Sequence, residues 1–523
     1  MTRLAELFAF ALLLSVAARA RVACADDLDA IKAKGTLVWG ADQEGGGPYV
    51  YPRDDDPARV TGFEVELADL IAKELGVGAV FFQGNWDKLP DLLRTRKIDI
   101  VLNGYELTPE RVAVMAATKP YYIYGLSLLV KTGSRLDLAA LKIAESPKRK
   151  IGVLTGSAAE TLARAELGAA VEIAGYDGNT DAMREVETGK LAATFQDTPI
   201  VAFYGPRFPK LEVKGDPLGE GHYVAYARAG EVRLTAEVDR ALLALYQRGE
   251  LERLYRRYGM WNAQQAGLAK VLGVPANDRP TVTPGPGPND EPAVPPITAA
   301  PRKHGLDVVR EQGPILLQAA GMTVLLSLLA FPLASALGLG LALARRYGGR
   351  WVRGLVTIYV EILRGTPLML QLFVIFFFLP EIGVRFSAFS TAIIGLSLNY
   401  SAYEAEIYRA GLGSVGPQQS EAARALGLSE SQTLLHVVLP QAVRVSIPPA
   451  VNDFVALFKD TSICSVVTVI ELTKRYSVVS MSTQATVELT VMTAILYLAM
   501  SLPISLLARR LEAHLDPRRA RRT

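Results

Sequence analysis

Several residue types and motifs are scarce or missing in this chain of 523 residues. Two cysteines exclude a scaffold held together by disulfides, and two cysteines with four histidines argue against a zinc cluster. A net charge of +3 gives no support for binding to nucleic acid. No GxxxxGK[ST] run occurs in the sequence, so the phosphate-binding loop of an ATPase is missing from it. These absences leave a protein without a metal, a cofactor or an ATPase motif of its own.

The overall composition indicates a chain whose halves lie in different solvents. Half of its residues are hydrophobic, 21% are charged, and the mean hydropathy is +0.21. At about 150 residues per domain the length allows about three units. We therefore expect a mixed soluble and membrane protein.

Residues 1–25 resemble a secretory signal peptide. Arg3 precedes an apolar run from Leu7 to Ala18, and Ala23-Cys24-Ala25 offers a cleavage site with small residues. An uncleaved anchor is the alternative, and either one exports the segment that follows.

The C-terminal half contains about five apolar stretches that predict transmembrane helices. Three lack charge altogether over at least about 18 residues, the usual length of a membrane span. The stretches are Glu311 to Arg345, Gly365 to Leu379, Arg385 to Glu404, Ile447 to Ile470 and Glu488 to Arg509. Clusters of arginine follow the first and the last, which places both of these ends in the cytoplasm and the residues before 315 outside.

A proline-rich segment joins the two halves. Residues 275–301 are rich in Pro and Gly and poor in large apolar side chains, a composition typical of an extended tether. The predicted domains are a signal peptide (1–25), a binding domain (26–262), a linker (263–310) and a membrane domain (311–523).

The exported half alternates short β-rich runs with helical ones. Strands are predicted at 36–39, 79–82, 98–101 and 151–154, and helices at 63–75 and 89–96. This alternation indicates an α/β domain, in which ligands bind on the loops after the strands.

Those loops carry groups suited to a zwitterion. Arg111 can hold a carboxylate with two hydrogen bonds, and Gly104 lets backbone approach a ligand. The turn with Ser157 precedes a predicted helix N-terminus, which favours an anion. Asp197 can receive an ammonium group, and Trp86 can form a wall of the pocket.

The exported half resembles the bilobal binding proteins for polar amino acids. The resemblance rests on Gly62 to Leu67, Trp86-Asp87, Lys97 to Asp99, Leu107 to Arg111 and Lys119 to Tyr122. It implies two lobes that close on the ligand. It also implies that Arg111 and Ser157 hold the α-carboxylate, and that Asp197 and the Gly104 carbonyl hold the α-ammonium.

Two positions depart from the pattern of that family. The aromatic residue expected before a Pro-aromatic pair is missing or moved, because the sequence reads Glu44-Gly-Gly-Gly-Pro-Tyr49. Glu106 stands where a Ser or Thr is usual. An extra acid there either favours a cationic amino acid or pairs with a nearby base and says nothing about the substrate.

A cytoplasmic loop carries the most specific motif. Glu421-Ala422-Ala423 is followed by Gly427 and by Val437 to Pro440, which predicts a short helix from Gln418 to Leu426, a break, and a second helix to Pro440. The spacing resembles the EAA loop of ATP-binding-cassette import permeases of the polar-amino-acid subgroup, over residues 313–515. The resemblance implies a type I importer fold in which Glu421, Ala422 and Gly427 couple transport to a separate ATPase subunit.

Polar residues within the bundle are candidates for a transport path, because such groups are costly in a membrane. Asn399 and Asp460 are these candidates. One permease bundle per chain predicts a second copy, with a homodimer as the simplest pore and a heteromeric pair as the alternative.

The leading interpretation is an amino-acid import subunit of the bacterial cytoplasmic membrane, with its N-terminal domain outside. Its expected partners are an ATPase, a second permease, a free polar or cationic amino acid and membrane lipid. The alternative is an amino-acid-gated receptor or ion channel. That alternative predicts a selectivity filter such as TVGYG, which the sequence does not contain, and leaves the EAA-like loop unexplained.

Overall fold

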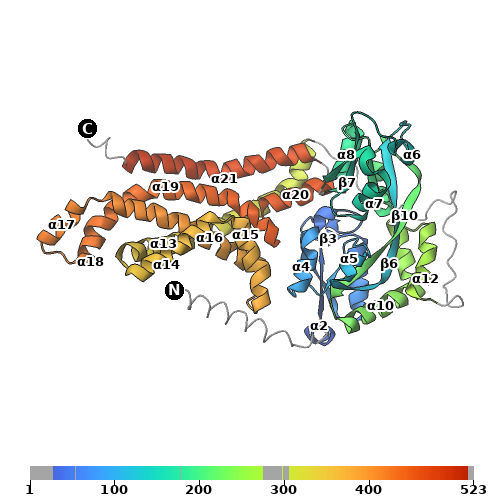
Figure 1. Cartoon of the computed structure of the whole chain (residues 1–523), viewed down its shortest axis with the longest axis horizontal. Coiled ribbons are helices and arrows are strands. Elements are labelled where there is room, and N and C mark those ends of the chain that lie inside the picture. Colours follow the sequence, from blue (N-terminus) through green and yellow to red (C-terminus); the bar gives the residue numbers. More distant parts are fainter. Residues whose placement is uncertain are drawn as a thin grey trace. The chain divides into compact units, whose positions relative to one another are not determined.

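A computed structural model describes residues 27–53, 55–176, 178–274, 297, 305–483 and 485–515 (Figure 1). The predicted signal peptide lies outside these residues, as does most of the proline-rich segment. The chain divides into two compact units, the first mainly of residues up to Lys303 and the second mainly of residues from His304 onwards. Each unit is described by itself below.

The first unit is built on an eight-stranded sheet of order β4-β1-β5-β10-β6-β9-β7-β8. Its strands are β1 (Thr36–Ala41), β4 (Gly78–Gln83), β5 (Ile100–Val101), β6 (Met115–Lys131), β7 (Arg149–Leu154), β8 (Val171–Tyr176), β9 (Ala193–Asp197) and β10 (Leu211–Arg228). A hairpin-like pair, β2 (Tyr51–Pro52) and β3 (Val60–Thr61), lies apart from it. The sheet therefore contains all four of the strands predicted from the sequence.

Two long antiparallel strands connect two lobes within this sheet. β6 and β10 have 17 and 18 residues and pair along most of their length, with irregularities between Lys214 and Tyr226. On one side β4, β1 and β5 are parallel and form lobe 1, and on the other β9, β7 and β8 form lobe 2. The bilobal α/β fold class is thus confirmed.

Helices cover both lobes. Lobe 1 carries α2 (Leu28–Lys34), α3 (Phe63–Glu74), η2 (Trp86–Lys88), α4 (Leu89–Arg94), α5 (Pro109–Val112), α10 (Val232–Gln247) and α11 (Glu250–Arg257). Lobe 2 carries α6 (Leu138–Leu141), α7 (Ala158–Leu167), α8 (Asn179–Thr188) and α9 (Thr198–Tyr204). The helices predicted at 63–75 and 89–96 correspond to α3 and α4. The apolar face of α3, with Phe63, Leu67 and Ile71, is fully buried in the core.

Residues 263–274, which lie within the predicted linker, are folded. They form η5 (Ala263–Gly267) and α12 (Leu268–Leu272), and Leu268 and Leu272 are fully buried in the core of the first unit. The Lys119 ammonium group donates to the carbonyl of Leu272 (2.7 Å). Apolar burial holds this segment to β6, a long-range contact that its local composition does not reveal.

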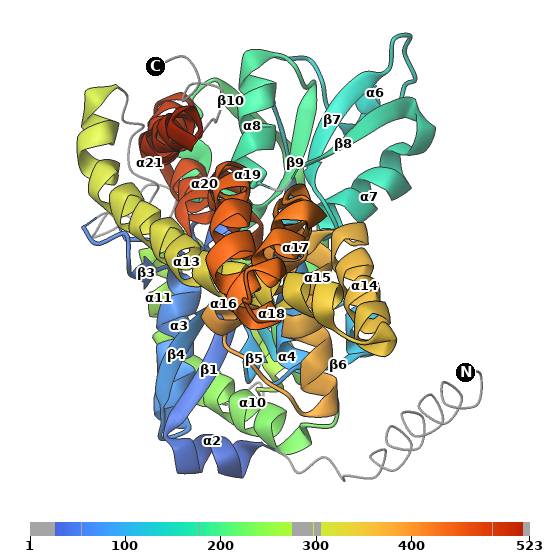
Figure 2. The same ribbon diagram turned by 90° about the vertical axis from the view of Figure 1, so that its left-hand side faces the viewer.

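The second unit is a bundle of helices (Figure 2). They are α13 (Leu306–Tyr347), α14 (Arg350–Gly365), α15 (Leu368–Phe373), η7 (Val374–Phe378), η8 (Leu379–Ile382), α16 (Ala388–Ser414), α17 (Pro417–Ala425), α18 (Glu430–Thr433), η9 (Leu434–Val438), α19 (Leu439–Asp460), η10 (Thr461–Val467), α20 (Leu472–Thr483) and α21 (Thr486–Leu515). Helix α16 packs between α13 and α19. Gly338 of α13 and Gly411 of α16 allow these close approaches, because a Cβ at either position would lie under 3.0 Å from atoms of the facing helix.

Several of these helices are suited to a membrane. Among the described residues, three helical stretches are long and apolar enough to cross one, namely Leu306–Tyr347, Glu430–Val467 and Thr486–Arg510. A fourth is possible if Arg350–Gly365 and Leu368–Ile382, bent by 107°, form one span. Helix α16 has 27 residues and holds the span expected between Arg385 and Glu404, but it is more polar than these. The all-α membrane class is confirmed, and a count of five crossings stays a prediction.

Candidate functional site

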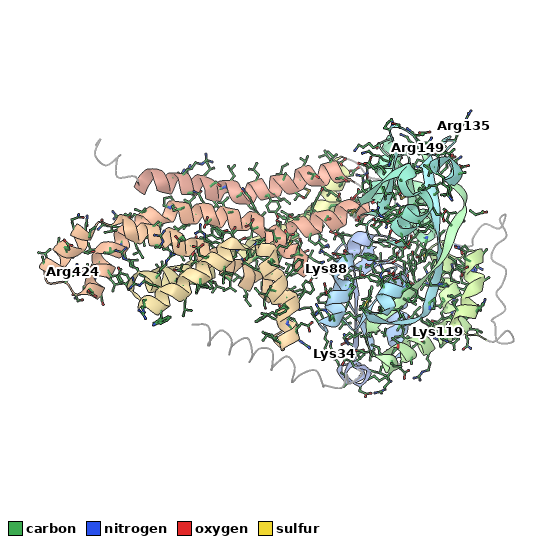
Figure 3. The ribbon with its side chains drawn as sticks, in the orientation of Figure 1. Lys34, Lys88, Lys119, Arg135, Arg149 and Arg424 are labelled. Carbon is green, nitrogen blue, oxygen red and sulfur yellow. The ribbon has the colours of Figure 1, made fainter. Side chains whose placement is uncertain are left out.

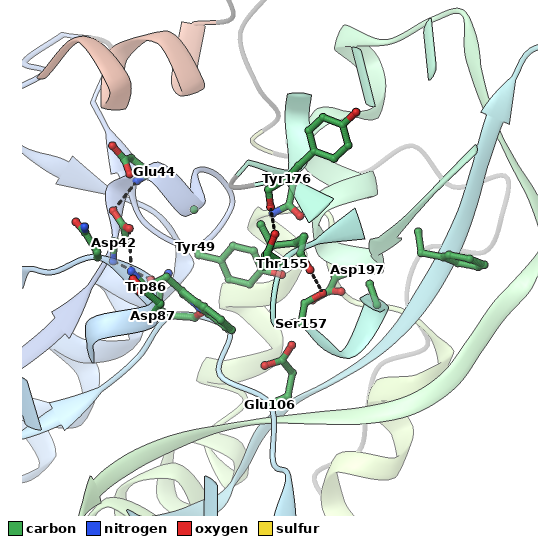
Figure 4. A pocket seen from close by; sticks show the side chains of 18 residues that line it. Asp42, Glu44, Tyr49, Trp86, Asp87, Glu106, Thr155, Ser157, Tyr176 and Asp197 are labelled. Atoms are coloured by element: carbon green, nitrogen blue, oxygen red, sulfur yellow. Dashed lines mark hydrogen bonds between the residues drawn. The ribbon is translucent and has the colours of Figure 1, made fainter. Parts of the chain in front are cut away.

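A cavity of about 410 Å³ lies in the first unit, where loops from both lobes meet (Figure 4). Its lining residues fall in two stretches, 42–106 from lobe 1 and 154–197 from lobe 2. Most of them follow the carboxyl ends of strands, where ligands of α/β sheets bind. Five of the six residues that the sequence analysis selected in this domain line the cavity, and Arg111 does not.

The lining is acidic. Among the described residues it includes five carboxylates and no Lys, Arg or His; the acids are Asp42, Glu44, Asp87, Glu106 and Asp197. Asp42 has a structural task, because its carboxylate accepts from the backbone N–H of Glu44 (3.0 Å) and of Trp86 (2.9 Å). The remaining negative charge makes the cavity favourable for a cation.

Asp197 lies at the end of β9, in a network of tyrosines. Its carboxylate accepts a hydrogen bond from the Tyr223 hydroxyl, and the hydroxyls of Tyr223 and Tyr49 share another (2.8 Å). Burial, and then the charge of Glu106, raise the pKa of Asp197 to about 7, although the hydrogen bonds of the tyrosines oppose this. A cation at this position would offset the cost of ionising a buried carboxyl.

Glu106 forms an ion pair with Arg111, the base expected to bind the ligand. One carboxylate oxygen of Glu106 contacts the Nη1 atom of Arg111, which also donates to the Glu106 carbonyl (3.1 Å). The guanidinium lies 5.1 Å from the ring centre of Trp86 and 4.7 Å from that of Tyr105. Burial disfavours the charge of Arg111, but the charge and hydrogen bond of Glu106 outweigh it and raise the pKa of the guanidinium.

Ser157 caps helix α7. Its hydroxyl accepts from the backbone N–H of Glu160 (3.3 Å) and donates to the carbonyl of Leu154 (2.7 Å). The next backbone N–H, of Ala158, donates to the second carboxylate oxygen of Glu106 (3.2 Å). The N-terminus of α7 therefore already faces a carboxylate.

Gly104 holds the floor of the cavity in a conformation that suits glycine. Its φ is +61°, and a Cβ there would lie 2.9 Å from the ring of Tyr49. Its N–H donates to Glu64 (2.7 Å), whose burial raises the pKa to about 7. Trp86 lies beside it at the cavity wall, where its indole N–H donates to the carbonyl of Asn103 (3.2 Å).

The missing aromatic platform has a steric reason. A side chain at Gly46 would meet the Tyr204 hydroxyl, which lies 2.4 Å from the position of its Cβ. The same hydroxyl accepts from the N–H of Gly47 (2.9 Å). The aromatic residues that line the cavity are instead Tyr49, Trp86, Tyr176 and Phe195.

Asn399 and Asp460, the two path candidates in the bundle, both connect helices. The amide of Asn399 donates to the side chain of Gln371 (3.2 Å), which ties α16 to α15 across the sharp bend. Asp460, at the end of α19, accepts from the Tyr400 hydroxyl of α16 (2.7 Å). Neighbouring positions of α16 thus bring the two residues into one region of the bundle.

The EAA-like motif forms a helix, a break and a second helix. Glu421 and Ala422 are exposed on α17, and Arg424 of the same helix is labelled in Figure 3. Gly427 has a φ of +88°, and the N–H groups of Gly427 and Leu428 bond back to carbonyls of α17 (2.9 and 3.2 Å), as in a Schellman motif. The second helix begins with a capping box at Ser429.

The second helix does not end at Pro440, as the sequence analysis expected. It continues through the π-helical turn η9 into α19, which ends at Asp460. Pro440 is the second residue of α19, directly after the π turn, where the ordinary hydrogen-bond pattern of an α-helix is already shifted. The proline is tolerated at that register change.

Comparisons with known proteins identify the second unit. Residues 336–521 match the family of binding-protein-dependent transport system inner membrane components. A probable glutamine permease of Bacillus subtilis, GlnM, is 38% identical over 37% of this chain and 90% of its own length. The glutamine permease GlnP of Escherichia coli is 34% identical over 38% of this chain and 92% of its own length. The chain belongs to this permease family.

The N-terminal half of the permease chain matches a second family. Residues 37–260 match the bacterial extracellular solute-binding proteins of family 3. Among solved structures, the ancestral amino-acid-binding protein AncCDT-1 is 29% identical, with a TM-score of 0.40 over 44% of this chain and 97% of its own. The chain therefore joins a segment that matches the solute-binding family to a permease component of the inner membrane. These matches are to transport components rather than to enzymes, and they support amino-acid import.

The structure of this permease also shows groups that sequence reasoning missed. Tyr223 and Glu64 support Asp197 and Gly104 from distant strands and helices, and only their position in the fold identifies them. In the bundle, Glu404 is fully buried on α16 against Gly338 of α13. The available signal was an acid that directly follows the uncharged stretch 386–403 within a 27-residue helix.

Proposed function

We propose that this chain captures an amino acid outside the cytoplasmic membrane and delivers it to its own permease. The observation that carries the proposal is a single-amino-acid-sized acidic cavity in a unit covalently joined to a permease bundle. Its volume of about 410 Å³ lies within the usual range for small-molecule sites, about 300 to 1,000 Å³.

The residues of the cavity suit the α-amino end of the ligand. Asp197 receives the ammonium group, because it is buried, acidic and held by Tyr223. The Gly104 carbonyl and the ring of Trp86 complete this end. Arg111 and the N-terminus of α7 at Ser157 bind the carboxylate end, since both favour anions.

Fusion of the two units shortens the search of the binding domain for its permease. We assign 1–25 to a signal peptide and the stretch between the folded units to a tether, which places the binding domain outside the cell. A tether keeps the effective concentration of the domain near its permease high without any new contact.

Transport draws its energy from a partner. The exposed loop of Glu421, Ala422 and Gly427 docks a separate ATPase subunit, which supplies the ATP hydrolysis. Asn399 and Asp460 contact the passing amino acid. Two copies of the chain form the pore, since one bundle supplies half of a symmetric permease.

Uptake by membrane vesicles tests this function. Right-side-out vesicles are prepared from cells that produce the chain with its ATPase and from a strain deleted for the chain, and uptake of each labelled L-amino acid is measured with and without internal ATP. We expect ATP-dependent uptake of one group of amino acids that the deletion abolishes and that Arg111→Gln reduces by at least tenfold. Glu172→Gln, at a surface ion pair with Lys150, is the matched control.

An ATP-independent ion current on addition of an amino acid would instead support a gated receptor or channel. Unchanged ATP-dependent uptake in the deletion strain would contradict the proposed function.

A further inference from the structure

Glu106 is an acid of the cavity whose carboxylate is bound from both lobes at once. One oxygen pairs with the Arg111 guanidinium on α5 of lobe 1. The other accepts from the Ala158 N–H, the first residue of α7 in lobe 2 (3.2 Å). The side chain of Glu106 is only 5% exposed, so this arrangement is built into the interior.

A guanidinium and a helix N-terminus together form a cradle for an anion. The guanidinium offers planar, charged donors, and the helix end offers backbone N–H groups with a favourable dipole. Here α7 has 10 residues, and its cap, Ser157, already uses its hydroxyl on Leu154 and Glu160. One further donor at this end of the helix, the Ala158 N–H, is met by Glu106.

The Glu106 side chain also separates Arg111 from the cavity. Glu106 lines the cavity and Arg111 does not, so a carboxylate entering it meets a negative charge before it meets the guanidinium. The stacking of Arg111 on Trp86 and Tyr105 holds the guanidinium in place behind Glu106. An amino acid in the present geometry would have its ammonium group attracted by Asp197 and its carboxylate repelled.

We propose that Glu106 is a built-in substitute for the carboxylate of the ligand, which must leave the cradle of Arg111 and α7 before an amino acid can bind there. This inference rests on the proposed function and adds a specificity-determining residue to it. Because the competitor is covalently attached, it lowers the apparent affinity by the fraction of molecules in which the cradle is free. A cradle occupied in about nine molecules of ten weakens binding by about tenfold.

The proposal predicts that removing the charge of Glu106 changes the affinity in the opposite direction from the loss of a ligand contact. If Glu106 bound a cationic side chain of the ligand, removing its charge would weaken binding. If Glu106 competes with the carboxylate of the ligand, removing its charge strengthens binding, and the gain depends on the carboxylate of the ligand.

Binding to the full chain in lipid nanodiscs separates these cases. The wild type, Glu106→Gln and Glu106→Ala are titrated with each of the twenty L-amino acids, and then with the α-amide of the amino acid that binds most tightly. We expect both variants to bind that amino acid at least tenfold more tightly, with no gain for its α-amide. Glu110→Gln removes an exposed acid next to Arg111 and serves as the control, with affinity within twofold of the wild type.

Each outcome has a separate meaning. Weaker or unchanged binding of the amino acid by both folded variants would overturn the competition, while amino-acid binding by the wild type would leave the proposed function standing. An equal gain for the α-amide would also overturn it, because the effect would then not depend on the ligand carboxylate. No binding of any amino acid by the wild type or by either variant would reject both proposals.

Discussion

The cavity and the EAA-like loop both contain a glycine in the left-handed backbone region, but the two glycines have different surroundings. Each contains a glycine with positive φ, Gly104 at +61° and Gly427 at +88°. A Cβ at Gly104 would meet the Tyr49 ring at 2.9 Å, whereas a Cβ at Gly427 would have no neighbour within 4 Å. The cavity therefore depends on crowding from distant segments, and the loop depends on backbone conformation alone.

The structure of the cavity thus depends on contacts between distant segments, whereas that of the loop depends on local residues. The cavity combines residues 42–106 with residues 154–197, so its chemistry exists only when both lobes fold and meet. The loop is one continuous segment with its own stop signal at Gly427 and its own capping box at Ser429. Substitutions in the two regions should consequently affect different steps of transport.

The largest expected effect is at Asp197. Asp197→Asn removes the charge that pairs with the ligand ammonium and should weaken amino-acid binding by at least about 100-fold, the scale of a lost buried charge pair. Titration of the full chain in nanodiscs measures it, with Glu172→Gln as the control. Binding within threefold of the wild type would mean that the ammonium lies elsewhere. The cavity would then not be the site that substitutions in this unit affect.

A smaller effect is expected at Gly427, and at a different step. Gly427→Val forces a β-branched residue into a left-handed conformation that costs about 1–2 kcal/mol, so ATP-driven uptake should fall by about tenfold or more. Amino-acid binding should stay within twofold, because the loop is not part of the cavity.

Gly427→Asn sharpens this test. Asparagine tolerates positive φ, and the surroundings are open, so this variant should keep most of the uptake. If asparagine and valine impair uptake equally, a side chain at the docking surface is the cause, and the backbone explanation is wrong.

The smallest expected effect is a dependence of binding on pH. The pKa of Asp197 is about 7 in the unliganded protein, so its ionised fraction falls from about three quarters at pH 7.5 to about one quarter at pH 6.5. The ligand ammonium stays protonated over this range, so the affinity should fall by about threefold as the pH is lowered. Isothermal titration of the full chain at both pH values measures the change.

The sign for stability is the opposite. Because the pKa of Asp197 is higher in the folded protein than in the unfolded chain, its contribution lowers the free energy of unfolding of the unliganded protein as the pH rises from about 4 to about 7. Above about pH 7 this contribution no longer changes. Glu64, with a pKa also raised to about 7, can add to both trends, so Glu64→Gln is measured alongside. An affinity that does not change with pH in either protein would show that Asp197 is already ionised at pH 6.5.

The sequence was most informative where signals are local. The strands at 36–39 and 151–154 follow from short β-rich runs, and the break at Gly427 follows from a glycine after a helix, and all appear in the structure. Five of the six selected residues line the cavity because the order of loops after strands already determines which segments meet.

The sequence was least informative where partners are distant or the register shifts. The contact of Glu106 with the Ala158 N–H joins lobe 1 to α7 of the other lobe, 52 positions further along the chain. Tyr204 fills the space beside Gly46 from 158 positions further along the chain. Pro440 stays helical because a π turn precedes it, and no local residue pattern announces that turn.

The length of α13 has a mechanical consequence. Its 42 residues extend about 63 Å at 1.5 Å per residue, about twice the hydrocarbon thickness of a bilayer. A helix of that length exceeds a single span, so we expect part of it to stand in water; Pro314 and Pro332 lie within it and are the places where it can bend. The tether of the proposed function then starts from the end of this helix at Leu306 rather than from the lipid surface. The reach of the tether is measured from that end, and inserting one helical turn near Leu306 would shift this starting point by about 5 Å without adding residues to the tether.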